Sequence, residues 1–178
     1  IDAYTAVRWV LSAGDLRGRV RDQTNNTPLG LAKVSGIGAN DTFDTESNMA
    51  GVYSVTVPAS LYDLTVTAWG YYSRTFASQA VLAGTRALAD FALQPLPTAV
   101  LQGVVRNNNG PVTNAFVYVE AHPALNGRTD NTGSYFFTIP VGRHTLIVQE
   151  PGYRIQRTIV TVGAAGTTQD ITVENAPS

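Results

Sequence analysis

The chain has 178 residues, 44% of them hydrophobic and 14% charged, and its 12 Lys and Arg against 13 Asp and Glu give a net charge of −1. The absence of cysteine excludes disulfides, thiolate nucleophiles and thiolate metal ligands. The basic residues are scattered along the sequence, and no apolar run approaches the roughly 20 residues of a membrane span, so we expect neither nucleic-acid binding nor a transmembrane segment.

The first segment, residues 1–15, has the pattern of a helix. Its apolar residues recur at close to the 3.6-residue helical period. Asp2 is a candidate N-cap and Gly14 a candidate for the left-handed position that ends a helix, which predicts a helix from Ile1 to Ala13. Because a lone helix of this length is marginal in water, we expect its apolar stripe to pack on other protein.

The remainder of the chain is a tandem repeat. Three anchor residues of the first copy recur at one constant offset in the second copy. These pairs are Gly51 and Gly133, Pro58 and Pro140, and Gly70 and Gly152. A constant offset predicts two domains of the same fold, residues 16–97 and 98–178, joined by a short proline-containing linker around residues 94–98.

Both copies have the pattern of short β-strands separated by turns rich in Gly, Pro and Asn. Leu64 and Val66 alternate with Thr65 and Thr67, which is typical of a strand with one buried and one solvent-exposed side. We expect strands over residues 16–21, 31–36, 42–47, 52–57, 62–68, 72–80 and 87–93, and again over 101–106, 115–121, 127–130, 134–139, 144–149, 154–162 and 169–173. Seven short strands per domain predict an all-β protein of two antiparallel sandwiches.

A recurrent motif connects both copies to a known family. In the second copy it is carried by Thr129, Asp130, Gly133, Tyr135, Phe137, Pro140, Gly142, Gly152 and Tyr153. This pattern resembles that of carboxypeptidase regulatory-like domains, and the first copy departs from it at Ser47, Asn48 and Ser60. The resemblance implies transthyretin-like, Ig-like Greek-key sandwiches that serve as non-catalytic modules of secreted or cell-surface proteins.

The motif residues have structural explanations that require no ligand. Gly51 and Gly133 are expected in turns with a positive φ, and Asp130 is expected to cap its turn by bonding to the backbone. Tyr71 and Tyr153 are expected to bury their rings and to donate their hydroxyls to nearby carbonyls. We assign to this structural motif Gly51, Tyr53, Gly70, Tyr71, Asp130, Gly133, Tyr135, Gly152 and Tyr153.

Residues 1–7, Ile-Asp-Ala-Tyr-Thr-Ala-Val, resemble the helix that closes the catalytic domain of subtilisin-like serine proteases. The resemblance implies that residues 1–15 end an upstream catalytic domain, whose catalytic residues would precede this chain. No Gly-x-Ser-x-Gly nucleophile motif occurs, so we expect no catalytic site and no cofactor here. The upstream protease domain of the same polypeptide would be the first partner.

Two local clusters are candidate ligand sites, each with a structural alternative. Trp69 and Tyr72 bring aromatic rings to a strand end, where exposed rings stack on sugars, although packing within or between the domains is favoured for Trp69. Asp41, Asp44 and Glu46 place three carboxylates in one short segment, a donor set that suits Ca²⁺, although a solvated acidic loop is favoured.

These features lead to two functional hypotheses. The first is a non-catalytic C-terminal accessory region of a secreted subtilisin-like serine peptidase, acting in stabilisation, in spacing, or in attachment to protein substrate or a surface. The alternative is a carbohydrate-binding or adhesion module that recognises a cell-surface polysaccharide, on an extracellular protein of another kind. Both hypotheses place the chain outside the cell, in a bacterium or an archaeon.

Overall fold

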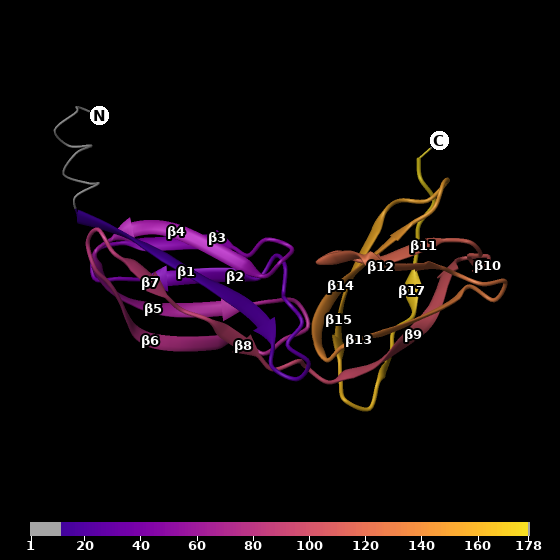
Figure 1. The fold of residues 1–178 in the computed structure, drawn as a ribbon. Helices are drawn as coiled ribbons and strands as arrows, with labels where there is room; N and C mark the ends of the chain where they lie inside the picture. The colour runs from indigo at the N-terminus through magenta and orange to yellow at the C-terminus, as the bar shows by residue number, and fades with distance from the viewer. Residues whose placement is uncertain (1–11, 178) are drawn as a thin grey trace. The chain divides into compact units, whose positions relative to one another are not determined.

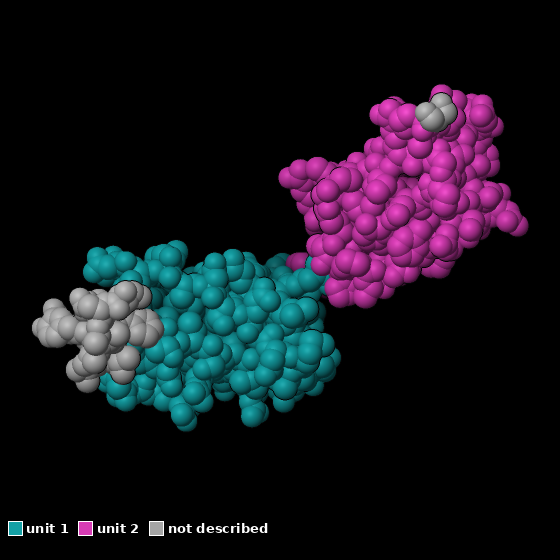
Figure 2. Space-filling model, turned by 90° about the horizontal axis from the view of Figure 1, so that it is seen from above, with its two compact units in different colours: residues 1–95 teal, residues 96–178 magenta. Residues whose placement is uncertain are grey.

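The computed structural model describes residues 12–177 and divides the chain into two compact units, residues 1–95 and 96–178 (Figure 2). Both units are built from β-strands, so the predicted all-β class is confirmed (Figure 1). No helix in the described part of the chain is long and apolar enough to cross a membrane.

The predicted N-terminal helix lies almost wholly outside the described residues. Where it was expected to end, the prediction is wrong, because β1 (Ala13–Asp22) already begins at Ala13. Gly14 pairs with Val57 of the neighbouring strand and has no positive φ. A Cβ atom on Gly14 would lie 2.3 Å from the carbonyl oxygen of Leu82, so a close backbone contact, and not a helix end, explains this glycine.

Unit 1 is a sandwich of two sheets (Figure 1). Its strands are β1, β2 (Lys33–Ile37), β3 (Thr42–Glu46), β4 (Val52–Pro58), β5 (Ser60–Thr67), β6 (Arg74–Val81), β7 (Arg86–Leu88) and β8 (Phe91–Leu93). One sheet has the order β4-β1-β7, with β8 also paired to β1, and the other has the order β3-β2-β5-β6. All neighbours are antiparallel except β7 and β8, which run parallel to β1.

Unit 2 repeats this arrangement. Its strands are β9 (Thr98–Asn107), β10 (Gly110–Pro111), β11 (Phe116–Val119), β12 (His122–Arg128), β13 (Ser134–Pro140), β14 (Gly142–Gln149), β15 (Gln156–Val162), β16 (Thr167–Thr168) and β17 (Ile171–Thr172). One sheet has the order β10-β9-β13, with β16 and β17 paired in parallel to β9. The other has the order β12-β11-β14-β15.

Each sandwich has its own apolar core, formed by the inward residues of both sheets. In β1 the fully buried Leu16 and Val20 alternate with exposed Arg17 and Arg19, as the predicted two-residue period requires. The equivalent strand β9 buries Leu101 in the same way. The core-facing positions are therefore apolar in both units, while the outward positions of the same strands are free to vary.

The last strand predicted for each copy is interrupted in the structure. In unit 1 the interruption falls at Ala89 and Asp90, between β7 and β8. The Tyr53 hydroxyl donates to the Ala89 carbonyl at 2.6 Å, and the Asp90 carboxylate accepts the backbone N–H of Arg19 at 2.8 Å. These side-chain bonds satisfy backbone groups at the break. In unit 2, β16 and β17 are interrupted in the same manner.

Candidate functional site

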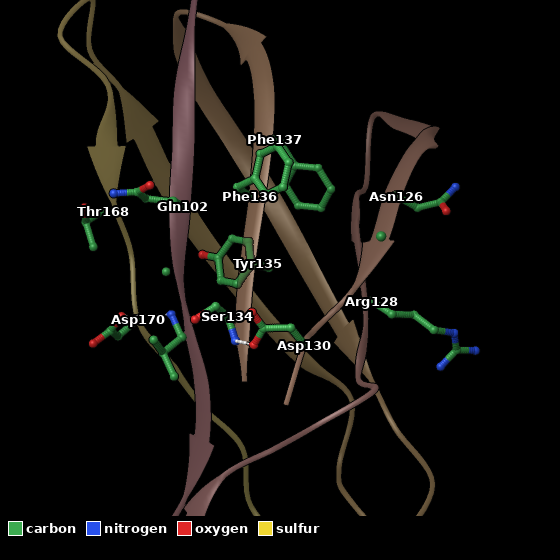
Figure 3. A pocket seen from close by; sticks show the side chains of 13 residues that line it. Gln102, Asn126, Arg128, Asp130, Ser134, Tyr135, Phe136, Phe137, Thr168 and Asp170 are labelled. Carbon is green, nitrogen blue, oxygen red and sulfur yellow. Dashed lines mark hydrogen bonds between the residues drawn. The ribbon is translucent and has the colours of Figure 1, made fainter. Parts of the chain in front are cut away.

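A groove of about 700 Å³ opens in unit 2, and residues of β12 and β13, the outermost strands of the two sheets, line it (Figure 3). Its lining comes from Gln102, Gly103, Val104, Asn126, Gly127, Arg128, Asp130, Ser134, Tyr135, Phe136, Phe137, Thr168 and Asp170. A place where two sheet edges meet is a natural binding position, because the backbone of an outermost strand has one side without a partner strand.

Tyr135 is the fixed centre of the groove wall. Its hydroxyl donates to the carbonyl of Gln169 at 2.5 Å, and Gly103 leaves the space that this contact needs. A Cβ atom on Gly103 would lie 1.9 Å from the Gln169 carbonyl oxygen and 3.1 Å from the Tyr135 hydroxyl. Burial, with a smaller effect of the Asp170 charge, raises the pKa of Tyr135, so the phenol stays a neutral donor.

The turn before β13 shapes one end of the groove. The Asp130 carboxylate accepts the backbone N–H groups of Thr132 and Ser134 at 2.8 and 2.9 Å, and Gly133 takes a φ of +74°. The Thr132 hydroxyl, followed by these two amides, lowers the pKa of Asp130. Asp130 is therefore an ionised cap of its turn.

The β12 wall is narrow and presents little side chain to the groove. A Cβ atom on Gly127 would lie 3.6 Å from the Phe137 ring, so the two edge strands approach each other at this glycine. Asn126 and Arg128 extend away from the Tyr135 ring (Figure 3). The Arg128 guanidinium is anchored by a 2.6 Å bond to the carbonyl of Asn114.

Phe136 is the main apolar group at the mouth of the groove, with 74% of its surface exposed. It lies on the outer face of its sheet, where β13 pairs it with Gln102. Within the described residues no strand pairs with the other side of β13. An extended polypeptide could add to such an edge through backbone hydrogen bonds and cover an exposed ring. At the matching positions unit 1 has Ser54 for Phe136 and Thr45 for Gly127.

The sequence model of the carboxypeptidase regulatory-like domain matches the chain twice, over residues 15–94 and 100–174. The chain belongs to the carboxypeptidase regulatory-like domain family. The resemblance found in the sequence motif is thus confirmed, with one family domain in each compact unit. Carboxypeptidase regulatory-like domains are non-catalytic.

One curated relative is bacillopeptidase F of Bacillus subtilis (strain 168), which is 32% identical over 106 residues. The aligned region covers 58% of this chain and 7% of bacillopeptidase F, so the chain spans only a small part of that protein's length. The likeness is consistent with the predicted link to subtilisin-like peptidases, but only over this region.

Solved structures with a similar arrangement include two pilins. The minor pilin of Streptococcus agalactiae is 13% identical, with a TM-score of 0.49, 93% of this chain covered and 97% of the pilin covered. A streptococcal ancillary pilin is 12% identical, with a TM-score of 0.48 and coverages of 94% and 63%. These likenesses are too distant to bear on function.

Among the family motif residues, the turn residue Asp130 has the structural role expected of it, whereas Tyr71 and Tyr153 do not. The tyrosines that donate to backbone carbonyls are Tyr53 and Tyr135, whereas Tyr71 donates to the Asp22 carboxylate at 2.9 Å. Tyr153 accepts a bond from the Asn107 side-chain amide at 2.9 Å, and both it and Tyr71 are half-buried. The hydroxyls of Tyr71 and Tyr153 thus bond to polar side chains and not to the carbonyls that were expected.

The positive φ predicted for Gly51 and Gly133 is confirmed, and Gly70 and Gly152 share it. Gly51 and Gly133 take φ values of +72° and +74°, and Gly70 and Gly152 take +84° and +88°. At Gly51 a Cβ atom would also lie 2.5 Å from the carbonyl oxygen of Val20. These positions exclude other residues for backbone reasons, so the structure gives them no separate ligand role.

Trp69 and Tyr72 lie in the connection between β5 and β6, in the other unit from the groove. Trp69 is half-buried, while 48% of the Tyr72 surface is exposed. The Tyr72 backbone N–H donates to the carbonyl of Gln94 at 2.9 Å, which fixes the connection against the end of the unit. A sugar-stacking role for these two rings stays a prediction.

The predicted calcium cluster gains no support from the structure. Asp44 lies 3.2 Å from the ammonium group of Lys33 in the adjacent strand. The Ser35 hydroxyl, and then Lys33, lower the pKa of Asp44. Asp41 lies in the turn before β3 and Glu46 at its end. Among residues 12–177 no three His, Asp or Glu side chains are grouped as a metal site would require.

The groove was not predicted from the sequence, although one signal for it was present. Tyr135, Phe136 and Phe137 are three consecutive aromatic residues in a strand. Because neighbouring side chains of a strand point to opposite faces, Phe136 has to face outward when Tyr135 and Phe137 face the core.

Proposed function

We propose that this chain is a non-catalytic accessory region of a secreted subtilisin-like serine peptidase, and that unit 2 holds an extended segment of protein substrate. The observation that carries the proposal is the groove beside β13, where an edge strand without a partner adjoins the exposed ring of Phe136. The partners are an upstream peptidase domain in the same polypeptide and an unfolded stretch of protein.

Two sequence observations support a peptidase parent. The first is the 32% identity to part of bacillopeptidase F. The second is the resemblance of residues 1–7 to the closing helix of subtilisin-like catalytic domains. A secreted bacterial or archaeal enzyme would expose the two sandwiches to extracellular protein, which is the substrate that such an accessory region would meet.

The groove suits weak and general recognition of polypeptide. Backbone hydrogen bonds along β13 would be independent of the substrate sequence, because every residue except proline offers the same donor and acceptor. Phe136 would add about 2 kcal/mol when an apolar side chain covers its ring. Modest affinity of this kind allows release of the substrate after cleavage.

The test is a titration of the 178-residue chain, labelled with ¹⁵N, with a carboxymethylated protein that cannot fold. We expect the amide signals of β13 and β12 to shift. Replacing Phe136 with Ser, the residue that unit 1 has at this position, should weaken binding about thirtyfold.

The matched control is Ile159→Ser, which removes another exposed apolar side chain of unit 2, 56% exposed on β15. This variant should bind like the unchanged chain. Absence of shifts in β13, or equal losses in the Phe136 and Ile159 variants, would show that the groove does not hold polypeptide.

The alternative function is a carbohydrate-binding or adhesion module on an extracellular protein of another kind. The observation that favours it is the exposed ring of Tyr72, beside the half-buried Trp69. A panel of cell-surface polysaccharides should then change the fluorescence of the chain, and Tyr72→Ala should abolish that change. A Trp69→Phe variant identifies which tryptophan reports binding, and an unchanged signal with every polysaccharide refutes this alternative.

A further inference from the structure

Three arginines of unit 1 project from one face of β1. Arg17, Arg19 and Arg21 alternate with the buried residues Gly18 and Val20, so all three lie on the outer side of the sheet. Alternate residues of a strand are about 7 Å apart. The three arginine side chains are therefore attached at evenly spaced positions along one strand.

The neighbouring strands extend this positive surface. Arg86 of β7 is paired with Asp15 of β1 and is exposed. On the other side β4 contributes the uncharged Ser54 and Thr56, opposite Arg17 and Asp15. We call Arg17, Arg19, Arg21 and Arg86 together the arginine face.

Few carboxylates neutralise the arginine face. Asp15 lies 3.5 Å from the Arg17 guanidinium, and its other oxygen accepts the Thr56 hydroxyl at 2.8 Å. Among the described residues Asp90 also lies beside β1, where it accepts the backbone N–H of Arg19 and forms no ion pair. Arg19, Arg21 and Arg86 form no ion pair with any of the described residues.

Asp22, the other acidic residue of β1, is buried, and the exposed acidic residues that remain in the β-strands of unit 1 belong to the opposite sheet. Asp44 and Glu46 are exposed on β3, and Asp63 is exposed on β5. That sheet also holds Lys33 of β2 and Arg74 of β6, and Asp44 is paired with Lys33, so its charges nearly balance. On the outer side of the β1 sheet, by contrast, arginines outnumber acidic side chains. The near-neutral composition of the chain conceals this excess, because residues that are scattered in sequence gather on one face in the fold.

The fold itself does not require these arginines. In unit 2 the positions matching Arg17 and Arg19 are occupied by Gln102 and Val104, which pair with β13 as the arginines pair with β4. The one arginine retained there, Arg106, forms a 2.8 Å ion pair with Asp170 and is thereby neutralised. The same sandwich is therefore built without a positive face, so the face of unit 1 needs another explanation.

We propose that the arginine face binds an extended acidic glycan, a polysaccharide with acid groups repeated along its chain. Charge complementarity supports this partner, since guanidinium groups bind carboxylate and phosphate oxygens in a planar, two-pronged geometry. A row of arginines along a strand presents such groups in a line, as a linear polymer requires. The outward positions of β1, β4 and β7 hold no aromatic ring, which disfavours single-stranded nucleic acid, whose bases stack on such rings.

The inference is independent of the groove in unit 2 and of a peptidase parent. The test measures binding of the 178-residue chain to polygalacturonate by calorimetry, with uncharged dextran as the comparison polymer. Binding should be restricted to polygalacturonate and should weaken as sodium chloride is added, because salt screens exposed charges. The double substitution Arg17→Gln with Arg19→Val, which copies unit 2, should weaken it about tenfold.

The matched control removes the same charge elsewhere, by Arg143→Gln with Arg154→Gln, two exposed arginines of unit 2. This control and Phe136→Ser should bind polygalacturonate like the unchanged chain, and circular dichroism should show all variants folded. Equal losses in the two double variants would mean that only net charge matters, which overturns the proposal. Tighter binding to duplex DNA than to polygalacturonate would also overturn it.

Discussion

The two units share several internal hydrogen bonds but differ in their outer surfaces. Tyr53 and Tyr135 each donate to a backbone carbonyl at the break in the last strand, at 2.6 and 2.5 Å. Ser47 and Thr129 differ in type, yet each hydroxyl bridges two backbone groups of the preceding segment. The residue types allowed at these inner positions are therefore limited by the hydrogen bonds that the side chains form. One residue replaces another there only when it can form the same hydrogen bond.

The outer positions follow no such restriction. The sheet that contains β1 presents the arginine face, while the equivalent sheet around β9 presents Phe136 together with a neutralised pair, Arg106 and Asp170. The same framework thus displays two chemistries, one suited to acidic polymers and one to apolar segments. The difference teaches that the two units diverge on the outward residues of the sheets and at their edges, where both proposed binding sites lie.

The largest expected effect comes from the contact that both units share at a glycine of their central strand. A Cβ atom on Gly18 would lie 1.8 Å from the carbonyl oxygen of Ala89, and one on Gly103 would lie 1.9 Å from that of Gln169. Gly103→Ala should destabilise unit 2 by about 3 kcal/mol or more, because backbone must move to admit the methyl group.

Urea unfolding followed by amide hydrogen exchange in each unit measures this effect, and Gly18→Ala should act equally on unit 1. Gly163→Ala is the control, since a Cβ atom there meets nothing within 4 Å and the φ is not positive. If Gly103→Ala were as mild as the control, the shared contact would not hold the interrupted strand against the central strand of its sheet.

A smaller loss is expected from removing the hydroxyl that bonds to the interrupted strand. Tyr135→Phe leaves the part-buried carbonyl of Gln169 without its donor and should cost about 1–2 kcal/mol. Tyr53→Phe should cost the same in unit 1, because its bond to Ala89 has the same geometry. The free energy of unfolding in urea, determined for each unit, tests the equality, and a cost confined to one unit would show that the two breaks are not equivalent.

The sequence predicted the fold well because its signals are local and periodic. The alternation of Leu64 and Val66 with threonines follows directly from strand geometry, and the turn at Gly133 follows from the need for a positive φ. The break at Asp90 was missed, since the carboxylate that replaces a strand bond acts on Arg19, which is distant in sequence.

The candidate sites were predicted less well, because they depend on which strands become neighbours. Arg86 joins the arginine face only through the pairing of β7 with β1, a register that no local pattern fixes. The groove likewise requires β12 and β13 to be the outermost strands of different sheets. The sequence-based candidates, the aromatic pair Trp69 and Tyr72 and the acidic segment, were chosen because similar residues lie close together in the sequence. The groove offers no such signal, because it depends on Gly127 and on the outward direction of Phe136.

Replacing a strained residue of unit 1 by the residue found at the matching position of unit 2 should increase the stability of unit 1. Leu31 takes a φ of +58°, and Asn114, which has the matching backbone bond in unit 2, takes +61°. Leucine is poorly suited to this left-handed conformation, while asparagine tolerates it. Since Leu31 is 70% exposed, Leu31→Asn should sacrifice little burial and stabilise unit 1 by about 1 kcal/mol.

Asn114→Leu should make the opposite change in unit 2. Leu61→Asn serves as the control, because Leu61 is also exposed but lies in a regular strand without a positive φ. Urea midpoints decide the outcome, and a gain from Leu61→Asn as large as that from Leu31→Asn would attribute the effect to surface polarity and not to strain.

The smallest expected effect concerns acid, where a carboxylate in unit 1 replaces an amide in unit 2. Burial acts to raise the pKa of Asp22, but bonds from the Thr24 amide, the Tyr71 hydroxyl and the Asn25 amide outweigh it and lower the pKa. A lowered pKa means that Asp22 adds stability above its unfolded pKa of about 3.9, and that this stability is lost as the pH falls through the folded pKa.

The Asp22→Asn variant should therefore make the stability of unit 1 less dependent on pH below about pH 4, and the reverse change, Asn107→Asp, should make unit 2 more dependent. A second readout is the phenol of Tyr71, whose pKa is raised to about 12 by burial and then by its bond to Asp22 and the charge of Asp22. In Asp22→Asn this phenol should ionise at a lower pH in an ultraviolet titration. If neither the Tyr71 titration nor the pH dependence of unit 1 stability changed, the Asp22–Tyr71 bond would not account for any difference in stability between the two units.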